Sequence, residues 1–428
     1  MRRSLGALML AAALVAGCGS QPATPAPSAP AVDTARARTA TPTPTLGPIL
    51  HATPTMSGTP RPSPAAPPPA ETTTLPTGAV RTLPSGTFAL QASRAFTLVG
   101  TVARSPTFTI GMVNVSTGTS TRLASLPPGH QPTSLTVVGE RVVWVESWYA
   151  HPQTATGTGG NPNLGQPLLW QINSVSVTTG IRSVIASGSN TRIPVGGEGA
   201  GPLQPILAAD GDRVAYTLDR SGPGGTDASA IIVRSLSGGA VLRRIDADGY
   251  VAQVGLVGHR LFFREAFGIA GTSASVFPFD ASLMLARSDG EAPRLIDTHV
   301  SHAAMDAQTL VWSHEDATDA SIWTASLDTG LPFRVEGPPV IVAPGQPGPT
   351  SDLAVGPGVV GWIMWYPGAD GSWTSALVVW RTGDTEGRMI GGQGQPDWVV
   401  IEDGSLVWHE YLSLPGHDTH AMPISAIK

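Results

Sequence analysis

The sequence predicts an all-β fold in which one unit of four short strands is repeated around a ring. Three observations lead to this prediction. A turn of the type Thr-Gly or Asp-Gly, followed within a few residues by Arg, recurs six times along the 428-residue chain. An apolar segment of the type Arg-Val-Val-Trp precedes these turns. The chain ends where a seventh turn is due, and a matching piece, Thr77–Leu83, lies near its start.

The recurring turn marks the connection between the third and fourth strands of each unit. β-Branched and aromatic residues next to tight glycine turns are typical of short antiparallel strands. The six copies are Ser116–Arg122, Thr178–Arg182, Ser237–Arg243, Ser288–Arg294, Asp328–Arg334 and Arg381–Arg388.

The second strand of the unit is the easiest to recognise, and its copies are Arg141–Glu146, Arg213–Tyr216, Arg260–Phe263, Thr309–Trp312, Val359–Trp362 and Ser405–Trp408, with a degenerate first copy at Ser93–Phe96. Four strands in about 45–50 residues is the period of a β-propeller blade. We therefore expect seven four-stranded blades, with six or eight as alternatives. Because an open array would expose an edge strand, we expect Thr77–Leu83 to complete the last blade and close the ring.

Residues 1–17 are expected to be a lipoprotein signal peptide. Arg2 and Arg3 form a basic start, and the apolar run Leu5–Val15 is too short to span a bilayer. The segment Val15–Cys18 resembles a lipobox, which implies cleavage before Cys18 and attachment of lipid such as palmitate. Cys18 is the only cysteine, so no intramolecular disulfide is expected.

Residues 18–76 are rich in Pro, Thr, Ala and Ser and contain few large apolar residues. Such a segment buries too little surface to offset its ordering entropy, so we expect a disordered tether. Residues 77–428 then form one propeller domain outside the cytoplasm, lipid-anchored to the bacterial cell membrane. The net charge of −6 and the 13% of charged residues argue against a nucleic-acid partner.

The repeated Gly-x-Arg-Val-Val-Trp and Thr-Gly-x-x-x-Arg pattern resembles the TolB-like and WD-like β-propellers of bacterial envelope proteins. The resemblance covers about residues 77–428. It implies the propeller fold, and it leaves the function open, because such propellers serve as binding scaffolds, as accessory domains of peptidases and as enzymes. The chain departs from the pattern in having no long C-terminal extension and no regular Trp-Asp dipeptide.

Long insertions are expected on one face, the top face, which carries the connections from second to third strands and from blade to blade. They are Trp148–Leu168, Ser187–Gln204, Asp219–Ser229, Ala266–Ala281, Glu336–Thr350, Tyr366–Trp373 and Tyr411–Thr419. Loop elaboration on one face is where binding usually develops, although drift of unconstrained loops gives the same pattern.

Histidines and aromatic residues gather at the same face, on the blades that flank blade one. We expect a single patch suited to sugar or peptide contact. The alternative is that the histidines are ordinary polar loop residues. The candidate ligand-binding residues are Trp148, Tyr149, His151, His409, Tyr411, His417 and His420.

Signatures of metal binding and catalysis are weak. The pairs His299–His302 and His417–His420 have metal-type spacing but lie on different blades, so we expect no metal and no cofactor. No Gly-x-Ser-x-Gly motif occurs. Carboxylates recur near the ends of second strands, where capping a loop or pairing with an Arg is the simpler interpretation. They are Glu146, Asp219, Glu265, Glu315 and Glu410.

Three functions stay open on these grounds. The first is a binding or scaffolding lipoprotein that presents its top face to a protein or a glycan, without catalysis. The second is a hydrolase or lyase of envelope carbohydrate that uses acids such as Glu146, Glu265, Glu315 or Glu410. The third is a structural or sensor component of the envelope without a small ligand.

Overall fold

The computed structural model describes sixteen segments of the chain, all of them in the unit Pro64–Lys428. The expected signal peptide, Cys18 and the whole tether therefore lie outside the described residues, as do all residues of the closing strand except Arg81 and Thr82. The described segments are residues 81–82, 87–93, 96–102, 108–114, 120–151, 166–191, 204–221, 227–266, 281–315, 320–329, 332–335, 350–367, 373–390, 395–402, 404–412 and 416–427.

These residues form seven antiparallel sheets of four strands each. The first sheet consists of β2 (Thr87–Ser93), β3 (Phe96–Val102), β4 (Phe108–Asn114) and β5 (Ser120–Ser125). The second consists of β6 (Gln131–Val138), β7 (Arg141–Tyr149), β8 (Leu168–Ser176) and β9 (Arg182–Asn190). The third consists of β10 (Leu207–Asp210), β11 (Arg213–Ser221), β12 (Asp227–Ser235) and β13 (Val241–Ala247).

The remaining sheets continue the same order of strands. The fourth has β14 (Tyr250–Val257), β15 (Arg260–Ala266), β16 (Ala281–Arg287) and β17 (Arg294–Asp297). The fifth has β18 (Val300–Met305), β19 (Thr309–Glu315), β20 (Ala320–Ser326) and β21 (Pro332–Val335). The sixth has β22 (Thr350–Gly356), β23 (Val359–Pro367), β24 (Trp373–Arg381) and β25 (Arg388–Ile390).

The seventh sheet combines the two ends of the described chain. It consists of β26 (Gln395–Glu402), β27 (Ser405–Leu412), β28 (Gly416–Pro423) and β1 (Arg81–Thr82), followed by a short 3₁₀ helix, Ile424–Ala426. Strand β1 pairs with β28 through Arg81 opposite Ala421 and Thr82 opposite His420. The fourth strand of this sheet thus comes from the segment in which the sequence predicts it, as a two-residue strand.

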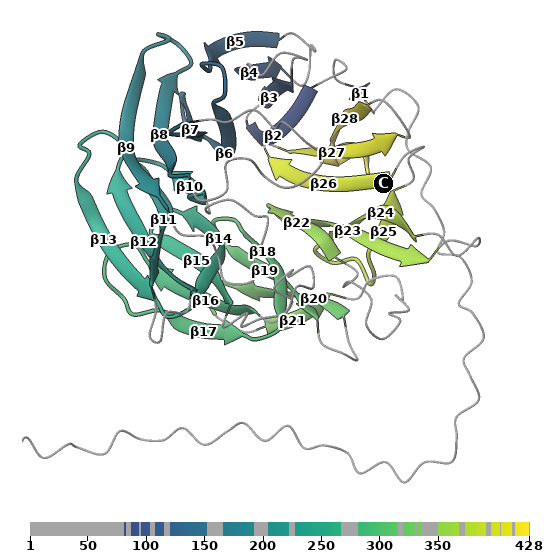
Figure 1. Cartoon of the computed structure of the whole chain (residues 1–428). Helices are drawn as coiled ribbons and strands as arrows, with labels where there is room; N and C mark the ends of the chain where they lie inside the picture. The colour runs from purple at the N-terminus through teal and green to yellow at the C-terminus, as the bar shows by residue number, and fades with distance from the viewer. Residues whose placement is uncertain are drawn as a thin grey trace, which may run out of the picture. The chain divides into compact units, whose positions relative to one another are not determined.

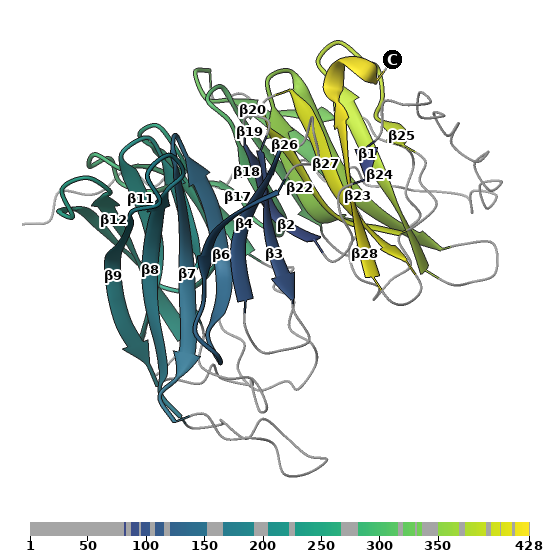
Figure 2. The same ribbon diagram turned by 90° about the horizontal axis from the view of Figure 1, so that it is seen from above.

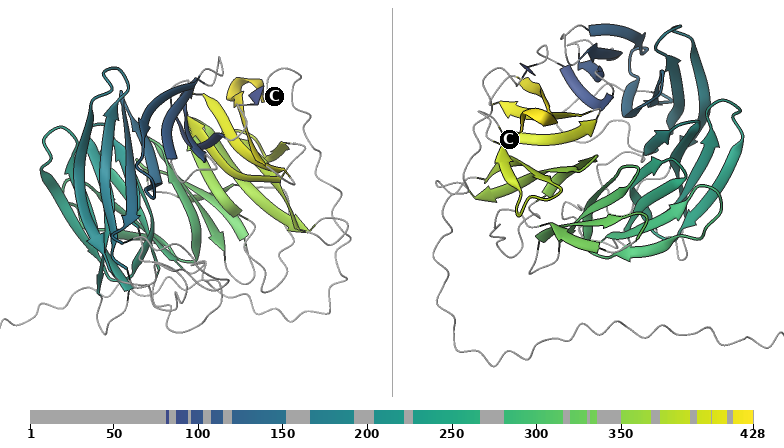
Figure 3. Two further views of the ribbon diagram at one scale, coloured as in Figure 1. Left: turned by 45° about the horizontal axis from the view of Figure 1, so that its top comes forward. Right: turned by 180° about the vertical axis from the view of Figure 1, so that it is seen from behind.

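Consecutive sheets lie next to one another through their first strands. The neighbours are β2 and β6, β6 and β10, and so on to β22 and β26, and β2 also lies beside β26. Figure 1 and the view from behind in Figure 3 show the sheets following one another around a common centre, and Figure 2 shows β6, β7, β8 and β9 side by side.

The core is distributed between the sheets. Six clusters of buried apolar residues each join two consecutive sheets. Strand β7 shows why: Val142 and Trp144 pack toward the first sheet, while Val143 and Val145 pack toward the third. Because successive side chains of a strand point to opposite faces, a sheet stacked between two others needs apolar residues at consecutive positions.

Two backbone features recur from sheet to sheet. Glycines with positive φ occupy the predicted turns, as at Gly139 and Gly180, where a side chain would be strained. In six of the seven sheets the first strand also shifts register against the second, at a bulge such as the one between Val300 and His302. A bulge redirects the following side chain, and Gln253 after one bulge bonds to the backbone of Ala303 in the next sheet, at 2.7 and 3.1 Å.

Several predicted loops are shorter than the sequence indicates, because the strands continue into them. Trp148 and Tyr149 extend β7 and pair with Leu169 and Leu168, so their assignment to a loop was wrong. Tyr411 and His417 likewise lie opposite each other in β27 and β28.

Candidate functional site

One group of buried polar side chains in the described part of the chain opens to a pocket on the side of the second sheet that faces the first. We call it the Glu146 pocket. Its volume is ≈ 500 Å³, and it is lined by Pro127, His130, Glu146, Trp148, Gln171, Asn173, Arg182, Ser183 and Val184. A volume in this range fits a small ligand or a few residues of a polymer.

Glu146 forms the base of the pocket, with 1% of its surface exposed. Its Oε1 lies 2.6 Å from Nδ1 of His130, and its Oε2 accepts hydrogen bonds from Nδ2 of Asn173, at 2.9 Å, and from the guanidinium of Arg182. Buried charges are tolerated when they are paired and hydrogen-bonded, and this carboxylate meets both conditions. The interpretation that Glu146 pairs with an Arg is confirmed.

Strand alternation and the repeat place these groups together. Val142, Trp144, Glu146 and Trp148 are every second residue of β7 and share one face of the sheet. Arg182 is the repeated Arg of the fourth strand. Its guanidinium bonds to Glu146 and lies 5.1 Å from the centre of the Trp144 ring, which is a cation–π contact.

His130 and Trp148 form the wall of the pocket. Their rings stack with centroids 4.3 Å apart and an angle of 8° between their planes. Because Nδ1 of His130 faces Glu146, Nε2 is the ring nitrogen left for a ligand. The exposed side chain of Val184 adds an apolar edge. His130 is not among the residues predicted from the sequence. The pairing of Pro132 with Glu146 places it at the pocket, and no sequence motif indicates that register.

Of the seven predicted ligand-binding residues, only Trp148 lines this pocket. Tyr149 ends β7 and is partly exposed, and His151 is exposed just beyond it. The other four lie in β27 and β28 of the seventh sheet, with the first sheet between them and Trp148 in the order of neighbouring strands. Within the described residues no contact joins the two groups into one patch, and the side chains of Tyr411 and His417 are not described.

The seventh sheet has its own polar cluster. The ring of His409 is buried and stacks on Trp398, with centroids 4.6 Å apart. The indole N–H of Trp408 donates to Oε1 of Glu410 at 3.0 Å, and Nε2 of His420 lies 3.6 Å from the other carboxylate oxygen. His409 and Glu410 are therefore part of the packed interior of the sheet.

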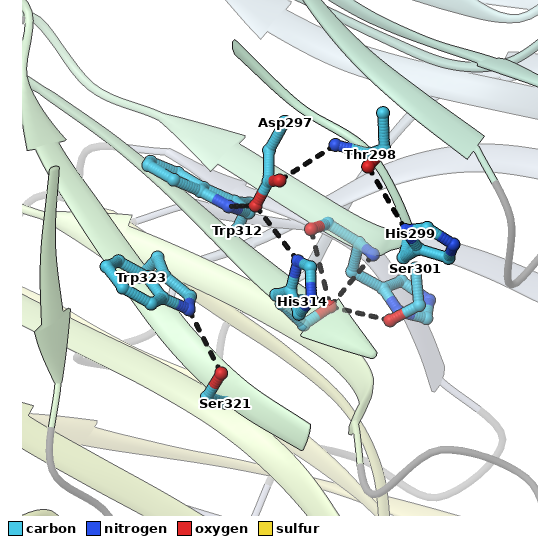
Figure 4. A network of polar contacts seen from close by, with 10 residues as sticks. Asp297, Thr298, His299, Ser301, Trp312, His314, Ser321 and Trp323 are labelled. Carbon is cyan, nitrogen blue, oxygen red and sulfur yellow. Dashed lines mark hydrogen bonds and ion pairs between the residues drawn. The ribbon is translucent and has the colours of Figure 1, made fainter. Parts of the chain in front are cut away.

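A third polar network joins the fourth and fifth sheets (Figure 4). Oδ2 of Asp297 accepts from the indole N–H of Trp312 at 2.7 Å and lies 3.1 Å from Nδ1 of His314. The rings of His299 and His314 are 6.0 Å apart, and His299 has a φ of 59°, which is uncommon for a residue other than glycine.

His302 lies close to this network, at the bulge of β18. Burial, with a smaller contribution from the nearby Arg264 guanidinium, lowers the pKa of His302 to about 3. The ring is therefore neutral at physiological pH. Among the described residues, no group of three or more His, Cys, Asp or Glu side chains is arranged to hold a metal ion.

The carboxylates proposed for catalysis are held separately in their own sheets. Glu265 accepts from the backbone N–H of Gly249 at 2.6 Å, and Glu315 accepts from the hydroxyl of Ser301 at 2.6 Å. Among these acids, only Glu146 opens to a described pocket. In the described part of the chain, no helix is long and apolar enough to cross a membrane.

Comparisons with solved structures identify the fold. The propeller domain of the trilobed protease from Pyrococcus furiosus matches with a TM-score of 0.50 and 9% identity, covering 77% of this chain and 93% of that one. An acylaminoacyl peptidase from Pyrococcus horikoshii matches with a TM-score of 0.51 and 10% identity, covering 77% and 49%. An oligogalacturonate lyase in complex with manganese matches with a TM-score of 0.50 and 12% identity, covering 82% and 92%.

These similarities show that the chain contains a β-propeller domain, and at such identities they show the fold alone. The chain spans about half the length of the peptidase. No family model and no curated protein matches the sequence.

Proposed function

We propose that the protein is a lipid-anchored, extracytoplasmic binding module, and that the Glu146 pocket on its β-propeller binds a carboxylate-bearing group of a glycan or a protein. The observation that carries this proposal is an open pocket whose base is a fully paired charge network and whose wall is aromatic. Such a site is rigid before a ligand arrives, which lowers the cost of binding.

The donor groups of the pocket favour an anionic ligand. Arg182 uses Nε for Asn173 and Nη2 for Glu146, and 34% of its side chain is exposed. A guanidinium has five N–H donors, so the exposed edge of Arg182 can still bind a carboxylate. Trp148 and Val184 would contact the apolar face of a sugar ring or a peptide side chain.

The binding test is titration calorimetry of the full chain with trigalacturonate and with a short peptide that ends in aspartate. At least one of them should bind, and Arg182→Ala should weaken that binding about tenfold or more. The matched control is Arg388→Ala, the same repeat position in the sixth sheet. Equal affinity in both variants, or no binding of either probe, contradicts the proposed site.

Membrane attachment rests on the lipobox-like Val15–Cys18 and the tether that follows it. Changing Cys18 to Ser should release the protein to the medium or leave an uncleaved precursor. Fractionation with the membrane after this change would rule out lipid on Cys18 as the anchor.

The proposal includes a closed ring of seven blades. It is supported by the pairing of β1 with β28 and by the proximity of β2 to β26. Deleting Thr77–Leu83 would expose the edge of β28 and remove ladder hydrogen bonds worth about 1 kcal/mol each. The deletion should lower the melting temperature, whereas deletion of residues 19–72 should not. Equal melting temperatures would contradict closure by this strand.

A second candidate function is a hydrolase or lyase acting on envelope carbohydrate. The contact that favours it is the 2.6 Å approach of Glu146 to His130, because a carboxylate that orients an imidazole at a pocket is a usual arrangement for general acid–base catalysis. Lyase activity on trigalacturonate would produce a conjugated double bond with ultraviolet absorbance, and hydrolysis would produce reducing ends. Loss of either signal in His130→Ala, with binding retained, would establish catalysis at this pocket.

A further inference from the structure

A second pocket lies on the opposite side of the same sheet, where the second sheet faces the third. Its volume is ≈ 350 Å³, and it is lined by Trp170, Ser187, Gly188, Ser189, Asn190, Pro205, Tyr216, Thr217, Leu218 and Asp219. These residues come mainly from the ends of β9 and β11. We call it the Tyr216 pocket.

Two aromatic rings form the inner end of the Tyr216 pocket. Trp170 and Tyr216 belong to the apolar cluster between the two sheets, and their ring centroids are 6.1 Å apart. Gly188 makes room for the indole, because a Cβ at this position would lie 2.5 Å from Cζ2 of Trp170. A side chain there would displace the ring, so the glycine and the tryptophan shape the pocket together.

In the part of the chain that the structure describes, neither the indole N–H of Trp170 nor the phenol hydroxyl of Tyr216 makes a hydrogen bond. The two residues are 6% and 5% exposed, but neither polar atom is fully enclosed, so both reach the solvent of the pocket. These two donors at the inner end of the pocket are therefore open to a ligand. Burial raises the pKa of Tyr216, which keeps its hydroxyl protonated and able to donate.

The remaining polar groups of the pocket are neutral or negative. Asn190 donates to the carboxylate of Asp219, and Ser187 and Ser189 add hydroxyls. Among the described residues that line the pocket there is no Lys, Arg or His, and Asp219 is the one formal charge. Arg234 is near enough to affect Tyr216 electrostatically, but it does not line the pocket and donates to the backbone of Ile185 at 2.7 Å. An anionic ligand would lose its hydration without gaining a cationic partner, so the pocket disfavours one.

We propose that the Tyr216 pocket binds one neutral sugar residue of a glycan. A sugar hydroxyl both donates and accepts hydrogen bonds, and it can therefore satisfy the Tyr216 hydroxyl and the Trp170 N–H. The C–H face of the ring would contact the aromatic residues. The volume is near the lower end of the range for ligand pockets, which suits a single sugar ring. This site is separate from the Glu146 pocket, which contains Arg182.

The test is titration calorimetry of the full chain with maltotriose, cellotriose and the trimer of N-acetylglucosamine, with trigalacturonate as the acidic comparison. At least one neutral trisaccharide should bind. Tyr216→Phe removes only the hydroxyl, and it should weaken that binding about tenfold. Arg182→Ala alters the other pocket and should leave it unchanged within about twofold. A thermal melt of each variant checks folding. Asn190→Ala is a second variant of the same pocket, at a partly exposed lining residue, and it should also weaken binding.

Three results would overturn the assignment. The first is that no neutral trisaccharide binds at millimolar concentration. The second is unchanged affinity in both Tyr216→Phe and Asn190→Ala. The third is loss of neutral-sugar binding in Arg182→Ala, which would place that sugar in the Glu146 pocket. Because the two pockets have separate variants and separate probes, failure of one proposal is distinguishable from failure of the other.

Discussion

Two carboxylates inside the propeller, Glu146 and Asp352, have opposite surroundings. Glu146 pairs with the guanidinium of Arg182 and is hydrogen-bonded on both oxygens. Among the described residues, the donors to Asp352, at the bulge of β22, are the backbone N–H groups of Leu353, at 3.0 Å, and Val399, at 2.8 Å. Desolvation raises the pKa of Asp352 to about 7, and the nearby Asp397 adds to the rise.

The difference lies in the partners: Glu146 has a guanidinium beside it, whereas the described donors to Asp352 are backbone N–H groups. In the second sheet the repeated Arg of the fourth strand provides a positive charge. At the inner strands, Gln253 and Asp352 each follow a bulge and bond to the backbone of the next sheet, which offers hydrogen bonds but no charge. We therefore expect ionic contacts with a ligand at the Glu146 pocket, and uncharged hydrogen bonds between blades near the centre.

Replacing Glu146 with Ala should have the largest effect on stability. Asn173 is fully buried and would lose its acceptor, and Arg182 would lose its counter-charge. We expect a loss of about 3 kcal/mol in the free energy of unfolding, measured by urea denaturation. The control is Glu140→Ala, an exposed carboxylate of the same sheet. Similar losses in the two variants would show that the Glu146 network contributes little.

Asp352→Asn should change how stability depends on pH. The folded state keeps the Asp352 proton up to about pH 7, whereas the unfolded chain releases it near 3.8. The wild-type contribution to the free energy of unfolding therefore falls as pH rises from about 4 to 7. The variant lacks this fall, so its stability relative to wild type should improve over that interval in urea melts. A constant difference between the two proteins would contradict the raised pKa.

His302→Gln should produce the opposite trend at the equivalent position of the fifth sheet. The folded state holds His302 neutral down to about pH 3, while the unfolded chain takes up the proton near 6.5. The wild-type contribution is therefore present above pH 6.5 and is lost as pH falls toward 3. The free energy of unfolding of the variant, relative to wild type, should therefore increase as pH is lowered through this window. Urea melts across the same pH series measure this difference. An increase as pH rises would contradict the lowered pKa of His302.

Glu410→Gln should have the smallest effect. Glu410 occupies the position of Glu146 in the seventh sheet, and its contacts include the indole of Trp408 and the ring of His420. Glutamine keeps an acceptor for the indole N–H, so we expect a loss of about 1 kcal/mol. A loss as large as that of Glu146→Ala would mean that the two positions depend on their partners less than we infer.

The sequence was sufficient to predict the repeat, because turn glycines such as Gly180 and paired apolar positions such as Val142 and Val143 are local signals. Of the candidate binding residues that it predicted, Trp148 lines the Glu146 pocket. It missed His130, the Tyr216 pocket and the bulges, because these depend on register and on packing between sheets. A long polar stretch does not reveal where a strand stops, which is why Trp148 and Tyr149 were assigned to a loop.

The central claim is that ligand binds at the Glu146 pocket. Hydroxyl-radical footprinting of the full chain, with and without trigalacturonate or the aspartate-ended peptide, tests it most directly. Trp148 lines the pocket and should be protected from oxidation by the bound probe, while Trp398, which packs against His409 in the seventh sheet, should not change. Protection of Trp398 with Trp148 unchanged, or no protection of either, would contradict the account.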